Sequence, residues 1–211
     1  MTRTHVPRLH LIGPLSGVLA PESYAAVAAR AAEGGVDAIH VRLPGVAGGE
    51  VMCLAQAVIA RIGLDVETTL FVNDRVDVAV LVGAGGAHLG ERSLSVSQAR
   101  RLLGADALIG RSVHDVKGAL QAQEDGANFV LAGHVFDTAS KPDQPGKGVE
   151  WIRQLASAVT IPVIAIGGIN VERVEQVIQA GAWGVAVGRE LLTASDPKAL
   201  AEAIRARIEQ K

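Results

Sequence analysis

The sequence predicts a (β/α)₈ barrel, the TIM-barrel architecture, and three observations lead to this fold class. Eight short apolar runs alternate along the chain with amphipathic runs that carry helix start and stop signals. Several of these runs are continuously apolar, as strands covered on both faces tend to be. Dividing 211 residues among eight units gives about 26 residues per unit, which suits a small barrel. An open doubly wound sheet stays as the alternative, because strand count alone does not force closure.

The expected strands are apolar runs that end in glycine or in polar residues. In chain order they are Leu9–Ile12, Ala38–Arg42, Leu70–Val72, Ala87–Leu89, Leu108–Gly110, Phe129–Ala132, Val163–Ile166 and Gly184–Val187. Side chains alternate along a strand, so His40 and Arg42 should face the barrel interior while Ile39 and Val41 face the helices. An interior arginine needs an anionic partner, either a bound carboxylate or phosphate or the nearby Asp74.

The expected helices lie between these strands. Pro21 opens the first helix and Gly34 closes it. Asn170 can cap the helix after the seventh strand, and Asp196 with Pro197 opens the last helix. No linker or low-complexity segment interrupts this order, so we expect one domain over residues 1–211.

Composition restricts the partners that the chain can have. Hydrophobic residues make up 49% and charged residues 20%, which excludes a disordered chain. Lys plus Arg is 20 against 22 for Asp plus Glu, with no dense basic run, so nucleic acid is not an expected partner. The longest apolar stretch, Ile161–Ile169, is far shorter than the roughly 18 residues of a membrane span, so we expect no membrane partner.

Cysteine usage and the N-terminus bear on the compartment. Cys53 is the single cysteine and cannot form an internal disulfide, so a cytoplasmic location is the default expectation. Arg3 and Arg8 precede Leu9–Ala20, which loosely resembles a secretory signal. The alternative is that this segment begins with a buried strand, because glycines and a proline interrupt its apolar part.

In a barrel, chemistry is expected at the C-terminal ends of the strands. His134 follows the sixth strand directly, and it either transfers protons or simply hydrogen-bonds loop backbone. The stretch Pro142–Gly148 after it has the composition of a loop that could close over a ligand. Asn73 and Asp74 follow the third strand, where they could contact ligand or cap the next helix.

Glycines follow the last two strands. Gly167 and Gly168 come before the helix near Asn170, and Gly188 with Arg189 comes before a further short helix. Backbone N–H groups at helix N-termini after strands 7 and 8 commonly hold a phosphate in barrels. The sequence therefore favours a phosphate-bearing ligand, although these glycines could serve only to turn the chain. No pair of histidine, cysteine or carboxylate residues has metal-ligand spacing, so no metal site is expected.

Five strings together identify a family. They are Phe-Val-Asn-Asp-Arg-Val-Asp-Val-Ala at 71–79, Gly-Ala-His-Leu-Gly at 86–90, Ile-Gly-Arg-Ser-Val-His at 109–114, Gly-His-Val-Phe-Asp-Thr-Ala-Ser-Lys at 133–141 and Ala-Ile-Gly-Gly-Ile at 165–169. With them the chain resembles the thiamine phosphate synthase and TenI superfamily along nearly its full length. The resemblance implies a barrel that binds a thiazole phosphate at its top, acts without a cofactor and forms a homodimer.

The superfamily contains two activities, and the residues differ between them. The resemblance implies that synthases carry Gln-x-Arg-x-Lys after the second strand, whereas this chain has His40, Arg42 and Pro44 there. Synthases also carry a second magnesium-binding aspartate where this chain has Ser93, although Glu91 could substitute. The Gly-His-Val-Phe string at 133–136 and the Arg-Ser-Val-His string at 111–114 resemble TenI-type thiazole tautomerases instead.

The expectation from these differences is a thiazole tautomerase, an isomerase that aromatises a carboxythiazole phosphate by moving one proton. The resemblance assigns acid and base catalysis to His134. It also implies substrate contacts from a wider set, namely His40, Arg42, Asn73, Ser112, Thr138, Lys141, Gly167, Gly168, Gly188 and Arg189. The alternatives are a thiamine phosphate synthase, which would couple a hydroxymethylpyrimidine diphosphate to thiazole phosphate, and a non-catalytic protein that binds thiazole phosphate or thiamine phosphate.

Overall fold

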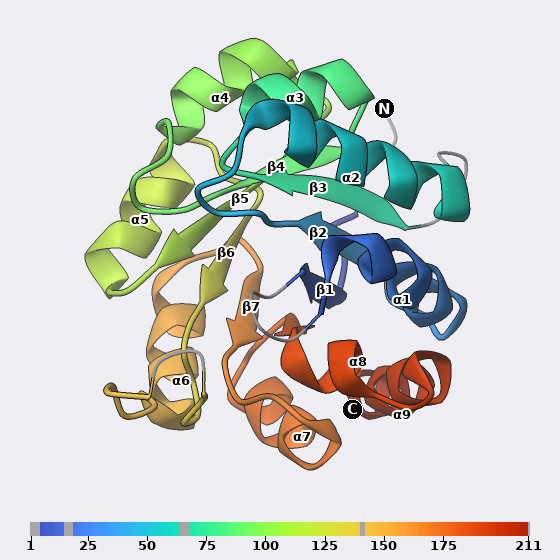
Figure 1. Ribbon diagram of the computed structural model, residues 1–211. Coiled ribbons are helices and arrows are strands. Elements are labelled where there is room, and N and C mark those ends of the chain that lie inside the picture. Colours follow the sequence, from blue (N-terminus) through green and yellow to red (C-terminus); the bar gives the residue numbers. More distant parts are fainter. Residues whose placement is uncertain (1–4, 15–18, 64–67, 140–141, 211) are drawn as a thin grey trace.

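Eight parallel strands close into a barrel, and helices surround it (Figure 1). The structure is a computed structural model that describes residues 5–14, 19–63, 68–139 and 142–210. The strands are β1 (Leu9–Gly13), β2 (Ala38–Val41), β3 (Thr69–Asn73), β4 (Gly86–Leu89), β5 (Leu108–Val113), β6 (Phe129–Ala132), β7 (Val163–Ile166) and β8 (Gly184–Val187). Strand β1 pairs with β8, placing Leu9 opposite Val185. The predicted barrel is therefore confirmed, and the open sheet is excluded.

The helices follow the predicted order. They are α1 (Pro21–Glu33), α2 (Gly48–Ile62), α3 (Val76–Val82), α4 (Val96–Leu103), α5 (Val116–Glu124), α6 (Gly148–Ala158), α7 (Val171–Gln179), the short α8 (Arg189–Thr193) and α9 (Pro197–Glu209). Helix α1 ends at the expected Gly34, while the side chain of Asn170 accepts a hydrogen bond from the backbone of Arg173 at 3.0 Å. Asp196 caps α9 in the same way. None of the helices in the described part of the chain is long and apolar enough to cross a bilayer.

Strict alternation along the strands divides the core into two regions. Ile39 and Val41 point outward and are fully buried between the barrel and its helices. Residues at the alternate positions of each strand point into the barrel. Among them, Phe71 of β3 and Phe129 of β6 meet edge to face, with ring centroids 5.6 Å apart. The inward-facing Gly110 leaves the room for this, because a Cβ there would lie 2.3 Å from the Phe129 ring. A small inward-facing residue on one strand thus makes room for a large side chain from the neighbouring strand.

Three histidines also lie inside the barrel. His10 and His40 are fully buried and His88 is 3% exposed. The Nδ1 atom of His10 lies 2.9 Å from Nε2 of His40, and Nε2 of His10 lies 3.1 Å from the Pro7 carbonyl oxygen. The His40 ring stacks on Phe71 at 4.8 Å. The expectation that His40 faces the interior is confirmed, and the barrel interior combines apolar side chains with buried imidazoles.

Burial keeps these imidazoles neutral. Desolvation lowers the pKa of His10 to about 4 and that of His88 to about 3. The pKa of His40 is also well below its ordinary value, because of burial and then of the neighbouring His10 and His88. The folded chain therefore takes up protons on these rings only at a pH below the range in which an unfolded chain does.

This difference predicts an acid-sensitive fold. From pH 6.5 down toward pH 4 the unfolded chain binds protons that the folded chain does not, so the free energy of unfolding should fall. Each such histidine contributes on the order of 1.4 kcal/mol per pH unit in that interval, and nothing above it. The free energy of unfolding of the His10→Gln variant, measured with urea, should depend less steeply on pH. The slope should be smaller by the contribution of one proton, about 1.4 kcal/mol per pH unit. A slope equal to that of the parent chain would contradict this account.

Candidate active site

Parallel strands bring their C-terminal ends to one mouth of the barrel (Figure 1). Arg42 follows β2, Asn73 ends β3, Ser112 lies in β5, His134 follows β6 and Gly168 follows β7. Thr138, Gly167 and Gly188 lie on the loops after β6, β7 and β8, Arg189 begins α8, and His40 lies within β2. Lys141 lies outside the described residues. The expected residues that the structure describes therefore gather toward one end of the barrel.

Arg42 does not extend into the barrel as predicted. Strand β2 ends at Val41, and the side chain of Arg42 is exposed at the mouth. Its charge is nevertheless close enough to the barrel axis to contribute to the lowered pKa of His88, after burial and other charges. None of the ion pairs found among the described residues joins Arg42 to Asp74. Among the described residues, the predicted internal pair of Arg42 with Asp74 is therefore not formed.

The two polar residues at the end of β3 have different roles. Asn73 is half-buried, and its side-chain oxygen lies 3.0 Å from Nδ1 of His40. Asp74 adopts a left-handed conformation with φ of 63°, and its Oδ1 accepts hydrogen bonds from the Gly90 N–H at 2.8 Å and from the Ser93 hydroxyl. Neither caps α3, whose N-cap residue is Arg75. The helix-cap alternative for this pair is therefore wrong.

The residues around Asp74 do not fit the two-carboxylate magnesium site that the resemblance implies for synthases. Ser93 stands where the second aspartate would be and donates its hydroxyl hydrogen to Asp74. Glu91, the possible substitute, lies 3.4 Å from Nε2 of His114 instead. No group of three histidine, cysteine or carboxylate residues within the described ranges is arranged to hold a metal. One carboxylate at this mouth is a weak magnesium site without a ligand's own oxygens.

His134 holds the loop that follows it. The side chain is 6% exposed, and its Nε2 lies 3.0 Å from the carbonyl oxygens of both Gln144 and Pro145. Because carbonyls only accept, Nε2 carries the proton. The backbone of Lys147 returns a bond to the His134 carbonyl at 3.0 Å. This is the loop-bracing arrangement that the sequence analysis left open beside proton transfer.

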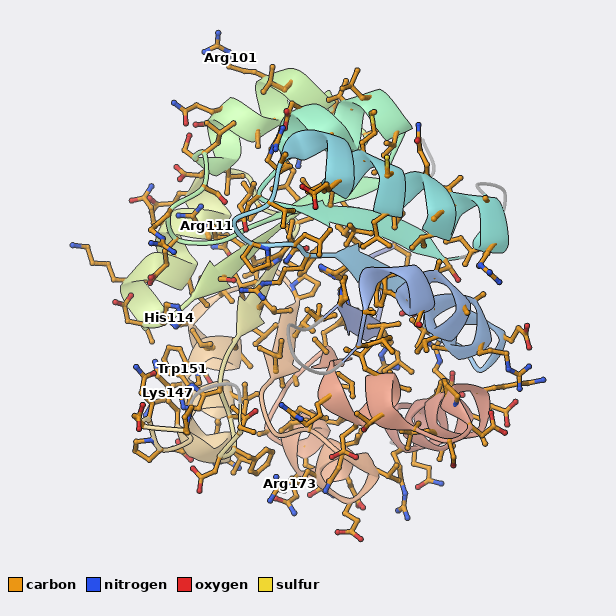
Figure 2. All side chains as sticks on the ribbon, viewed as in Figure 1. Arg101, Arg111, His114, Lys147, Trp151 and Arg173 are labelled. Atoms are coloured by element: carbon orange, nitrogen blue, oxygen red, sulfur yellow. The ribbon has the colours of Figure 1, made fainter. Side chains whose placement is uncertain are left out.

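A second set of contacts ties this loop to its neighbours (Figure 2). The Nζ atom of Lys147 donates to the His114 carbonyl at 2.5 Å and lies 4.6 Å from the centre of the Trp151 ring. His114 in turn faces Glu91, and Arg111 donates to the Glu91 carbonyl at 3.4 Å. The loops after β4, β5 and β6 therefore form one connected rim on this side of the mouth.

The two glycines after β7 form a tight turn that packs against the loop after β6. Gly167 and Gly168 both have positive φ, 101° and 64°, which favours glycine. A Cβ at Gly168 would lie 2.6 Å from the Asp137 carbonyl oxygen. Arg173 donates to the Gly168 carbonyl at 2.7 Å and covers the Phe136 ring at 4.7 Å. The turn is thereby fixed beside the rim, with α7 starting directly after it.

Two inward-facing histidines of this region were not among the predicted site residues. His10 and His88 lie one below and one beside His40 in the barrel, and His88 Nε2 is 2.8 Å from the Ser112 hydroxyl. The sequence indicates their direction, because side chains alternate along a strand and both histidines occupy inward-facing positions, His10 in β1 and His88 in β4. The Nδ1 atoms of His88 and His134 are both buried with no partner among the described residues.

The comparisons with known proteins agree on one family. The family model described as thiamine monophosphate synthase matches residues 15–191. A thiamine-phosphate synthase of Pyrococcus abyssi is 39% identical over 181 residues, 86% of each chain, and one of Halalkalibacterium halodurans is 37% identical over 190 residues, 90% of each. A solved thiamine phosphate pyrophosphorylase from Pyrococcus furiosus superposes with a TM-score of 0.85 at 30% identity, covering 96% of both chains.

These relatives overturn the expected isomerase activity. They are named for the synthase, a transferase, and the thiazole tautomerase interpretation is therefore wrong. That interpretation rested on His40, Pro44 and Ser93 and on the strings at 111–114 and 133–136, whereas the similarity to synthases extends over most of the chain. The proton-transfer role assigned to His134 depended on the isomerase reaction and is not carried further. On the matched residues and the barrel together, the chain belongs to the thiamine monophosphate synthase and TenI superfamily.

Proposed function

We propose that this chain is a thiamine-phosphate synthase, a transferase that couples a hydroxymethylpyrimidine diphosphate to thiazole phosphate. The observation that carries the proposal is the set of relatives so named, at 37–41% identity over most of the chain. In this coupling the bond from the pyrimidine methylene carbon to the diphosphate oxygen breaks. A new bond forms from that carbon to the thiazole nitrogen, and diphosphate leaves with the electron pair.

The geometry supports two anion sites at the mouth. The positive-φ turn at Gly167 and Gly168, together with Gly188, suits the thiazole phosphate. The exposed guanidinium of Arg42 suits the diphosphate, because guanidinium groups bind phosphate oxygens through paired N–H donors. Asn73 and Ser112 lie between these two places at the ends of β3 and β5. The ring bodies of both substrates would then meet over the barrel axis.

The departure at Ser93 shapes how this transferase depends on metal. A synthase with one carboxylate should need more magnesium than one with two, since the diphosphate itself must supply the remaining oxygens. Catalysis itself is expected to require both substrates and no organic cofactor. The single domain remains a prediction from the length and the continuous order of elements, the cytoplasmic location a prediction from cysteine usage, and the homodimer a prediction of the family resemblance.

An assay with both substrates tests the function. Purified chain should release thiamine phosphate and diphosphate, and Ser93→Asp should lower the magnesium concentration for half-maximal rate by about tenfold, because it supplies a second carboxylate beside Asp74. Ser97→Asp, on the exposed start of α4, is the matched control and should change nothing. No product at any magnesium concentration would reject the synthase. It would favour the non-catalytic phosphate-binding protein, which the residues at Pro44 and Ser93 make the second candidate.

The phosphate site makes a separate prediction. Gly168→Ala should weaken the binding of inorganic phosphate by on the order of tenfold, because the side chain strains a positive φ and meets the Asp137 carbonyl. Gly126→Ala is the control, since Gly126 also has a positive φ, 88°, but has nothing within 4 Å of the added Cβ. Both variants should lose about 1–2 kcal/mol of stability from the positive φ, Gly168→Ala more than Gly126→Ala because its Cβ also meets the Asp137 carbonyl oxygen, and only Gly168→Ala should lose phosphate affinity in an NMR titration.

Loop bracing by His134 can be measured directly. His134→Phe keeps a ring but removes the N–H that faces Gln144 and Pro145, so it should cost about 1–2 kcal/mol of stability. Trypsin cleavage after Lys147 should become faster in the native protein, because the loop is released. His5→Phe, at an exposed histidine, serves as the control. Unchanged proteolysis and unchanged stability in His134→Phe would show that the ring does not hold the loop.

A further inference from the structure

We infer that Arg173 is a positioning residue for the phosphate site, because it fixes the direction of the peptide group between Gly168 and Ile169. Arg173 lies in the first turn of α7 and was not among the predicted site residues (Figure 2). It acts through the backbone of the glycine turn and needs no contact with the ligand itself. That the ligand is thiazole phosphate rests on the proposed function, whereas the direction of the peptide group rests on contacts within the chain.

Three successive carbonyl groups at the end of β7 each accept a hydrogen bond. The carbonyl oxygens of Ile166 and Gly167 accept, at 2.9 Å and 3.0 Å, from the next two backbone N–H groups after His134, on the loop that follows β6. The third carbonyl oxygen, that of Gly168, accepts from Nη1 of Arg173 at 2.7 Å. Backbone donors therefore hold the first two peptide groups, and a side chain holds the third.

The direction of each carbonyl also sets the direction of the following N–H. The peptide groups of this turn are trans, so the C=O and the N–H of each group point in opposite directions. The N–H groups of Gly167, Gly168 and Ile169 therefore point away from the donors that hold the carbonyls. For the first two, this direction is toward β8, because β7 lies between β6 and β8 in the barrel. The backbone hydrogen bonds found among the described residues use none of these three N–H groups.

This arrangement suits an anion on the N–H side of the turn. Backbone N–H groups attract a phosphate and carbonyl oxygens repel it, so the turn binds phosphate only while its carbonyls face elsewhere. Gly168 has a φ of 64°, and glycine rotates more freely than any other residue. The peptide group after Gly168 can therefore turn over most easily, which would bring its carbonyl oxygen toward the anion. The hydrogen bond from Arg173 opposes this rotation.

Other features keep the Arg173 side chain at this carbonyl. Its guanidinium carbon lies 4.7 Å from the centre of the Phe136 ring, where the face of the ring attracts a cation. The ion pairs found in the described ranges do not include Arg173, so no carboxylate there competes for its donors. A Cβ at Gly168 would lie 3.2 Å from Nη1 of Arg173 and 2.9 Å from Cβ of Phe136. The close approach of both side chains therefore depends on glycine at this position.

The direction of the peptide group can be measured without any ligand. The residual dipolar coupling of the Ile169 N–H in the full ¹⁵N-labelled chain reports the direction of this bond. Arg173→Met keeps an unbranched side chain but has no donor, so the coupling should be reduced or should change sign. Arg173→Lys should restore it, because an ammonium group can donate to the same carbonyl. A coupling in Arg173→Met equal to that of the parent chain would overturn the inference, whether or not the chain is a synthase. Arg173→Gln, whose side chain is too short to reach, takes the place of Arg173→Met if that variant does not fold.

Inorganic phosphate is the probe for the anion site. Its dissociation constant should rise about tenfold in Arg173→Met, because one N–H donor to the anion is no longer held in place, and should stay within about threefold of the parent value in Arg173→Lys. Arg207→Met is the matched control, since it removes an arginine that lies 3.8 Å from Glu175 of the same helix, and it should change nothing. Unchanged affinity in Arg173→Met, or no phosphate binding by the parent chain, would overturn the positioning role. Lost affinity with an unchanged Ile169 coupling would also overturn it, because Arg173 would then contact the anion directly.

Kinetics with both substrates connect this role to the proposed function. Arg173→Met should raise the KM for thiazole phosphate by about tenfold and leave kcat and the KM for the pyrimidine diphosphate unchanged, because the two anions are expected at different places. An equal rise in both KM values would overturn the assignment of Arg173 to the phosphate turn. A parent chain that forms no product would count against the proposed function alone, since the Ile169 coupling and the phosphate titration still decide the inference.

Discussion

The pairing of β1 with β8 is the contact on which the rest of the molecule depends. The Val185 N–H donates to the Arg8 carbonyl at 2.8 Å, while Arg8 donates through Nε to the Trp183 carbonyl at 2.9 Å. Asp37 accepts from the backbone of Leu9 at 2.7 Å and from Arg205 of α9 at 2.7 Å. These bonds join the first strand to the last strand and helix. Closure brings eight strand ends into one ring, and without it the turns after β2 and β7 would lie far apart along the carboxyl edge of an open sheet.

Closure also creates an interior that solvent cannot reach, and the chain places imidazoles there. Buried polar groups must find partners, and three neutral histidines can do so only in particular tautomers. His10 and His40 bond to each other and end on a backbone carbonyl, while His88 reaches Ser112. The polar interior is therefore connected to the mouth at two points, Asn73 and Ser112. A purely apolar barrel core would leave the side chains at those two points free to rotate.

Sequence reasoning predicted the fold well because the relevant signals are local. Apolar runs and strand parity predicted the barrel and the inward direction of His40, and Asn170 and Asp196 marked helix starts correctly. The exposure of Arg42 at the mouth could not be predicted, since it depends on β2 ending one residue earlier than expected. The contacts of His134 join residues ten and eleven positions apart in an irregular loop, which no periodicity encodes. The predicted tautomerase activity was wrong for another reason. It depended on a few residues near the strand ends, whereas similarity to synthases extends over most of the chain.

Some residues at the mouth are held by buried contacts, and others lie on loops with contacts only to their neighbours. This difference determines which positions can change without disturbing the barrel. Asn73 and the Gly167–Gly168 turn are held by buried bonds and by backbone geometry, so a substitution there disturbs the barrel as well as the ligand. Arg42, Asp74 and Ser93 lie on loops, and their bonds are local to the rim. Serine at position 93, where the resemblance implies aspartate in synthases, is accommodated because its hydroxyl donates a hydrogen bond to Asp74. Substitutions in these loops can therefore change local contacts while the barrel and the contact between Asn73 and His40 stay in place.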